Sequence, residues 1–104
     1  MKLYIDTSNG ERVMIQFDEE RLETKSKKDK SQKLLEFLDK KLKEKKLKLS
    51  DVSEIEVNTG PGSFTGLRVG VSVAQTLGWV LNVPVNGKDI GKGEIIDILY
   101  ADSD

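Results

Sequence analysis

Residues 58–70 read Asn58-Thr59-Gly60-Pro61-Gly62-Ser63-Phe64-Thr65-Gly66-Leu67-Arg68-Val69-Gly70, a glycine-rich turn followed by the start of an apolar segment. The two glycines beside Pro61 permit backbone angles that other residues rarely adopt, which is typical of a tight turn. Ser63 is suited to cap a helix, because its hydroxyl can accept a hydrogen bond from a free amide of the first turn. Residues 64–81 are nearly all apolar or small and contain no proline, which predicts a helix buried on most sides. A short apolar run at 55–57 precedes the turn, so this part of the chain is predicted to form a strand, a turn and a buried helix.

Small residues recur at every fourth position of the predicted helix, and in a helix they share one face: Gly66, Gly70, Ala74 and Gly78. Each glycine inside a helix costs about 1 kcal/mol relative to alanine, so close approach of another helix is expected to offset that cost. A membrane helix would use the same device, but the apolar run starts beside Arg68 and is shorter than the about 20 residues of a span. We therefore predict that this small-residue face is an interface with a partner helix outside a membrane.

Five segments have the composition or the alternation of strands, namely residues 2–6, 11–17, 21–27, 52–57 and 83–85. Asn9-Gly10, between the first two, is a hairpin signal. The third segment is nearly all polar and is expected at an edge of the sheet. The last contains Pro84, which a strand tolerates only near an end.

A change to helical periodicity follows residue 29, where apolar side chains form a stripe: Leu34, Leu35, Leu38 and Leu42. Phe37 lies off this stripe and is interpreted either as a contact for a partner or as a residue that widens the core, with both alternatives left open. The predicted order is β-β-β-α-β-α-β, an α/β fold with a mixed sheet and two helices.

Composition limits the chemistry that the chain can perform. Its 104 residues suffice for one small domain with a modest core. The absence of cysteine and histidine excludes disulfides, a thiol nucleophile, a Cys/His zinc site and a histidine base. A cytoplasmic location is expected, because the lack of cysteine fits a reducing compartment and the N-terminus does not have the pattern of a signal peptide.

Charge is distributed unevenly along the chain. Residues 25–48 contain eleven lysines and four acidic residues, a net charge of +7, whereas the whole chain has a net charge of −1. Such a segment is typical of a solvated helix face, and it also suits contact with nucleic acid or an acidic partner.

Three segments of the chain resemble the TsaB family (YeaZ-like, glycoprotease-homologue proteins), namely residues 60–71, Tyr4-Ile5-Asp6-Thr7-Ser8 and Leu77-Gly78-Trp79-Val80-Leu81-Asn82-Val83-Pro84-Val85. The resemblance covers residues 2–87 and implies a single actin-like ATPase subdomain of the ribonuclease-H-like kind. It also implies a role in the synthesis of threonylcarbamoyladenosine in tRNA, through pairing with the catalytic subunit TsaD. Chains of this family normally continue into a second domain. Here residues 1–87 are expected to form the N-terminal domain and residues 88–104 a short tail, with the second domain absent.

The resemblance places Asp6 and Thr7 where actin-like ATPases carry their first phosphate loop. Ser63 stands at the start of the predicted helix, and a helix N-terminus attracts anions. These three residues are therefore candidates for a vestigial phosphate or metal site. Capping of a turn is the simpler interpretation of Asp6. Gly60-Pro61-Gly62 does not have the glycine spacing of the common nucleotide-binding motifs. Arg68 is the lone charge of the predicted helix, and its contact is left open. No catalytic residue, metal ligand or cofactor is predicted.

The predicted function is therefore that of a non-catalytic partner subunit, which pairs through its two helices with a TsaD-like catalytic subunit or with a second copy of itself. Any ATP and magnesium would be bound by the partner or at a shared interface, and tRNA would be reached through the complex. Two alternatives are an RNA-binding helper that uses residues 25–48 and a fragment of a two-domain protein. No membrane contact is expected.

Overall fold

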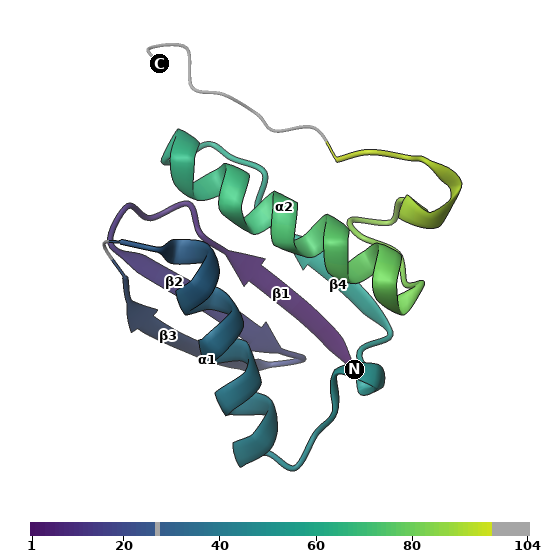
Figure 1. Ribbon diagram of the computed structural model, residues 1–104, viewed down its shortest axis with the longest axis horizontal. Coiled ribbons are helices and arrows are strands. Elements are labelled where there is room, and N and C mark those ends of the chain that lie inside the picture. The colour runs from purple at the N-terminus through teal and green to yellow at the C-terminus, as the bar shows by residue number, and fades with distance from the viewer. Residues whose placement is uncertain (27, 97–104) are drawn as a thin grey trace.

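The computed structural model describes residues 1–26 and 28–96 (Figure 1). Within these residues four strands form one mixed sheet in the order β3-β2-β1-β4. The strands are β1 (Lys2–Asp6), β2 (Arg12–Phe17), β3 (Glu20–Lys25) and β4 (Glu54–Val57). β2 is antiparallel to both β1 and β3, whereas β4 is parallel to β1. The α/β class, the mixed sheet and the edge position of the polar strand β3 are confirmed.

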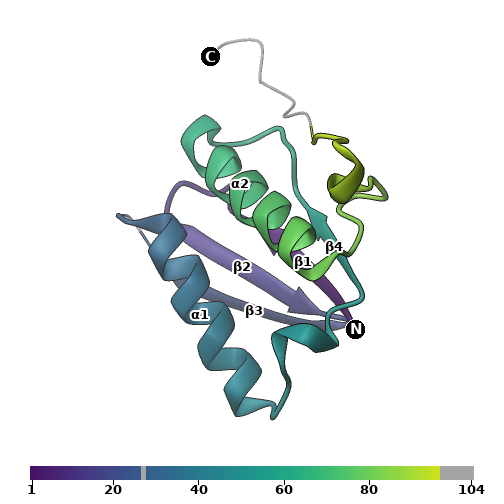
Figure 2. The same ribbon diagram turned by 45° about the vertical axis from the view of Figure 1, so that its right-hand side comes forward.

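Two helices lie on the same face of this sheet, α1 (Lys30–Glu44) and α2 (Phe64–Leu81), as Figures 1 and 2 show. α1 packs on β2, and α2 packs on β1 and β4. Two short 3-10 turns, η1 (Leu49–Asp51) and η2 (Ile90–Lys92), follow the helices. In the described part of the chain no helix is both long enough and apolar enough to cross a membrane.

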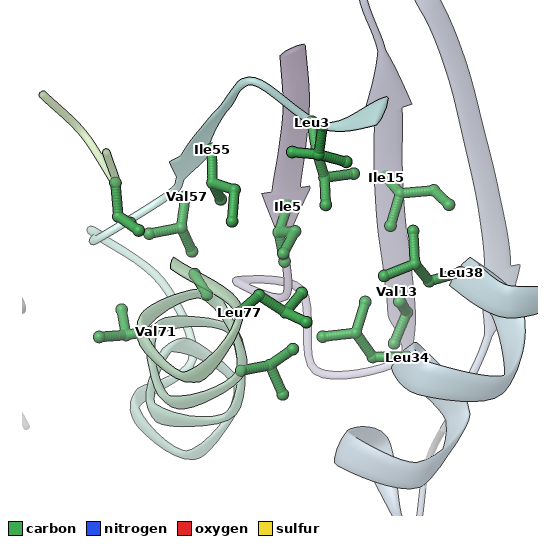
Figure 3. Packing of buried hydrophobic residues seen from close by; sticks show 14 of the residues in the cluster. Leu3, Ile5, Val13, Ile15, Leu34, Leu38, Ile55, Val57, Val71 and Leu77 are labelled. Carbon is green, nitrogen blue, oxygen red and sulfur yellow. The ribbon is translucent and has the colours of Figure 1, made fainter. Parts of the chain in front are cut away.

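The core lies between the sheet and the two helices (Figure 3). Strand residues alternate between the two faces of a sheet, so the register that pairs Leu3 with Phe17 and with Ile55 places all three on the helix side. α1 contributes Leu34 and Leu38 to this layer, as its leucine stripe predicts. The opposite face of the sheet carries the intervening residues, most of which are polar, and is not covered by a helix of the described residues.

α2 has the bounds that the sequence predicts, but it is buried on one side only. Ser63 caps its start by accepting a hydrogen bond from the amide of Gly66 at 3.3 Å, as predicted, and Asn82 ends it in a left-handed conformation. On the side away from the sheet, Trp79 is 67% exposed and Val80 is 65% exposed. The prediction of burial on most sides is therefore wrong, because a sheet with helices on one face covers only one face of each helix.

The predicted fifth strand is reduced to a single bridge, in which Val85 pairs with Ile55. Asn86 and Gly87 both adopt left-handed conformations and turn the chain back, so that Val85 and Lys88 exchange two backbone hydrogen bonds. The side-chain amide of Asn86 then forms hydrogen bonds with the edge of β4 at positions where a neighbouring strand would pair. Its Oδ1 accepts from the amide of Val57 at 2.8 Å, and its Nδ2 donates to the carbonyl of Val57 at 3.1 Å.

The segment after this turn packs on the flank of α2 that lies away from α1 (Figures 1 and 2). Ile96 is only 7% exposed and belongs to the core cluster, and Ile90 packs against that cluster. Residues 88–96, predicted as part of a tail, thus contribute to the packing of the domain. The rest of the predicted tail, residues 97–104, lies outside the described residues.

Candidate functional site

The small-residue face of α2 points into the protein's own sheet. All four of its members are buried: Gly66, Gly70, Ala74 and Gly78. A Cβ atom at Gly66 would overlap the backbone oxygen of Thr7, and one at Gly78 would overlap the side chain of Val85. The prediction that this face is an interface with a partner is therefore wrong. The energetic cost of the glycines is offset by close packing of α2 on the sheet of the same chain.

Phe37 is a core residue. Its side chain is 9% exposed and lies in the core cluster, with the ammonium of Lys41 5.6 Å from the centre of its ring. Of the two alternatives that the sequence leaves open, the structure supports the one in which Phe37 widens the apolar stripe of α1, and the interface alternative is wrong.

Asp6 holds together the loops that follow β1 and β4. Its Oδ1 accepts three hydrogen bonds, from the amide of Ser8 at 2.9 Å, from the hydroxyl of Ser8 at 2.6 Å and from Nδ2 of Asn58 at 3.2 Å. Oδ1 of Asn58 in turn accepts from the amide of Gly60 at 2.9 Å. The bond to the amide of Ser8 caps the turn after β1, which is the role that an aspartate favours. Asn58 connects the carboxylate to the glycine turn in front of α2.

Thr7 and Ser63 join the same end of the sheet to α2. Thr7 is fully buried and its hydroxyl donates to the carbonyl of Gly66. The backbone amide of Ser63 donates to the carbonyl of Ser8 at 2.8 Å. Asp6, Thr7 and Ser63 thus lie at the same end of the sheet, and their polar groups form hydrogen bonds within the protein. Within residues 1–26 and 28–96 there is no cluster of acidic side chains that could hold a metal ion.

Apolar side chains also line a groove on the outside of the molecule, between α1 and α2. It consists of two adjoining hollows of about 440 and 190 Å³ that share Leu35 and Leu77. The larger hollow is otherwise lined mainly by leucines: Leu38, Leu42, Leu47 and Leu49. The smaller is completed by Ser72, Val73 and Thr76. We call this feature the interhelical groove.

The interhelical groove remains open to solvent in this chain. Leu35 is 48% exposed, although it belongs to the leucine stripe of α1, and Asp39, Lys43 and Lys48 stand around the larger hollow. An apolar surface bordered by charged residues is typical of a binding site for another protein. The sequence signal for this groove is the series of leucines in and just after α1, which continues beyond the predicted stripe to Leu47 and Leu49.

Arg68, the lone charge of α2, lies on the exposed side of the helix with its guanidinium 5.5 Å from the centre of the Phe64 ring. It does not take part in the Asp6 hydrogen bonds or in the groove.

A hairpin-led mixed sheet, with β4 parallel to β1 and two helices on one face, defines an actin-like, ribonuclease-H-like unit. Comparison with known proteins identifies the family to which this unit belongs. The family model described as "TsaD: tRNA N6-adenosine threonylcarbamoyltransferase" matches residues 23–87. The chain belongs to this glycoprotease-like family, which confirms the resemblance seen in the sequence.

Individual relatives carry the names TsaB and YeaZ. The "tRNA threonylcarbamoyladenosine biosynthesis protein TsaB" of Bacillus subtilis is 53% identical over 36 residues, which is 35% of this chain and 16% of that protein. The TsaB of Buchnera aphidicola is 36% identical over 61 residues, 59% of this chain and 29% of that protein. A crystal structure of a YeaZ-like protein from Pseudomonas aeruginosa superposes with a TM-score of 0.68 at 32% identity, covering 81% of this chain and 40% of the other. The chain thus corresponds to less than half the length of these relatives.

Proposed function

We propose that this chain is a non-catalytic subunit in the biosynthesis of threonylcarbamoyladenosine in tRNA. In this role it binds a TsaD-like catalytic subunit through the interhelical groove between α1 and α2. The names of the TsaB relatives support the assignment of this chain to that biosynthetic pathway. The observation that supports the mode of binding is the groove itself, an apolar surface between two helices that the chain leaves open.

The family match supports the choice of partner. The model named after the transferase spans residues 23–87, and this range contains α1 and α2. A transferase of the same family is therefore expected to present a related pair of helices. Two helix pairs can pack with their apolar grooves facing each other, and this arrangement buries both surfaces in one four-helix contact.

The arrangement around Asp6 supports a role without catalysis. One oxygen of its carboxylate already accepts three hydrogen bonds from the protein, and the sequence contains neither histidine nor cysteine. ATP and magnesium are therefore assigned to the partner or to the shared interface. The cytoplasm, where tRNA is modified, is the expected location.

Co-purification with the TsaD-type transferase of the same organism tests this proposal. The wild-type chain is expected to form a complex of equal stoichiometry. Leu35→Glu introduces a charge into the groove and should prevent the complex, since an unpaired charge is costly to bury. Gln32→Glu, one turn away on the exposed side of α1, introduces the same charge outside the groove and should leave the complex intact. Absence of the wild-type complex, or an unaffected Leu35→Glu complex, would count against the proposal.

The alternative of an RNA-binding helper receives less support. Three lysines of the basic segment form ion pairs, Lys41 with Glu44 at 3.0 Å, Lys43 with Asp39 at 2.9 Å, and Lys45 with Glu20. These acidic side chains reduce the local positive charge. The pairs favour the interpretation of this segment as a solvated helix face, and we propose no direct contact with RNA.

A further inference from the structure

β3 lies at one edge of the sheet, and in the part of the chain that the structure describes no other strand pairs with its outer side (Figure 1). In antiparallel pairs, residues alternate between those whose backbone groups point to the neighbouring strand and those whose groups point away from it. The amide of Ser26 donates to the carbonyl of Glu11, the residue opposite it, so the backbone of Ser26 faces β2. By alternation, the backbone groups of Arg21, Glu23 and Lys25 point outward. An edge of this kind can accept a further strand.

The side chains along this edge are complementary to themselves in one register. In an antiparallel pair of β3 strands related by a two-fold axis at Leu22, Arg21 of each copy lies opposite Glu23 of the other. Both residues have outward backbone groups, so each pair is also joined by backbone hydrogen bonds. Moving the axis to either neighbour, Arg21 or Glu23, would place two like charges directly opposite each other, which is unfavourable. The charges therefore favour the register centred on Leu22.

We propose that a second copy of this chain binds at the outer edge of β3, so that the two four-stranded sheets join into one continuous sheet. Leu22 is partly exposed and packs against the edge of the core cluster. On the two-fold axis it meets Leu22 of the second copy, which covers the open end of both core layers. This inference concerns the chain alone and does not depend on the proposed function.

The helix layer leaves room for this pairing. α1 packs on β2, and in the joined sheet the two β2 strands are three strand spacings apart, about 14 Å. Packed helices need only about 8–10 Å between their axes, so the two α1 helices fit side by side. The interhelical groove lies on the α2 side of α1, away from β3, and stays open in the dimer.

The opposite edge of the sheet limits the assembly to two copies. There Val85 already pairs with Ile55, and the amide of Asn86 forms two hydrogen bonds with the backbone of Val57. Each chain thus offers one edge for strand pairing, and a two-fold contact between two such edges is closed.

Sedimentation equilibrium of the isolated chain tests the proposal. The wild-type chain is expected to dimerise at micromolar concentration. Arg21→Glu and Glu23→Arg should each weaken dimerisation by at least about tenfold, because either change places like charges opposite each other in both pairs. Lys88→Glu, in the exposed turn beside the opposite edge of the sheet, is the matched control and should have no effect. Leu35→Glu should also have no effect, which distinguishes this contact from association through the interhelical groove.

Combining the two charge reversals tests the register. A chain that carries both Arg21→Glu and Glu23→Arg again has opposite charges in both pairs and should dimerise as well as the wild type. An equimolar mixture of the two single variants should contain more dimer than either variant alone at the same total concentration, for the same reason. A monomeric wild-type chain, single variants that dimerise as well as the wild type, or a double variant or mixture without recovered dimer would each overturn the proposal.

Discussion

Gly66 is the position at which the packing of α2 depends most directly on a single atom. A Cβ there would overlap the backbone oxygen of Thr7, and backbone cannot move aside as a flexible side chain can. The same Thr7 donates its hydroxyl to the carbonyl of Gly66, so α2 and the end of β1 are joined by a hydrogen bond and by close contact. The glycine is required by the sheet of the same chain and not by a partner.

Gly66→Ala is therefore predicted to destabilise the fold. The overlap should lower the free energy of unfolding by about 1–3 kcal/mol, as overpacking of a core does, although alanine is the better helix former. Urea unfolding followed by circular dichroism measures this. Gly10→Ala is the control, because a Cβ at Gly10 would meet no atom within 4 Å, and it should change the free energy of unfolding by less than about 1 kcal/mol. Equal stability of the two variants would show that α2 does not lie this close to β1.

At the level of the elements, the side chain of Asn86 closes the outer edge of β4. Its amide forms two hydrogen bonds with the backbone of Val57 where a further strand would otherwise pair. Asn86→Gly keeps the left-handed backbone accessible but removes both bonds, so it should lower the free energy of unfolding by about 1–3 kcal/mol.

Asn82→Gly separates this effect from backbone conformation. Asn82 also has a left-handed backbone, at the end of α2, and no hydrogen bond of its side chain is part of the sheet. Its replacement by glycine should change stability little, because glycine is the residue that most often takes this left-handed position at the end of a helix. If thermal melts show the two glycine variants to be equally stable, the amide of Asn86 does not support the sheet edge.

The elements themselves were largely predictable from local signals. The alternation of apolar and polar residues predicted the three N-terminal strands. Ser63 and the unbroken apolar run after it predicted both ends of α2. The fifth strand was not predictable from its β-branched residues, because the left-handed turn at Asn86-Gly87 ends it after one pair. The partner of the small-residue face was not predictable either. Periodicity shows which residues share a face, but not whether that face packs on a sheet, on a helix or on another molecule.

For the whole molecule, the sheet and the two helices leave the interhelical groove open to solvent. Leu35 is exposed there although it belongs to the apolar stripe of α1, which is understandable if a partner completes this layer. Asp6, Thr7 and Ser63, the candidates for a phosphate or metal site, instead form hydrogen bonds with other groups of this chain near the start of α2, namely with Asn58 and Gly66.

Titration calorimetry of this chain with the TsaD-type transferase of its own organism, at several temperatures, tests the partner-subunit account most directly. The account predicts a saturable one-to-one complex whose heat capacity change is negative, because closing the groove buries apolar surface. Leu35→Glu should weaken binding by at least about tenfold, and Gln32→Glu should not. No binding of the wild-type chain, or binding that Leu35→Glu does not weaken, would contradict the account.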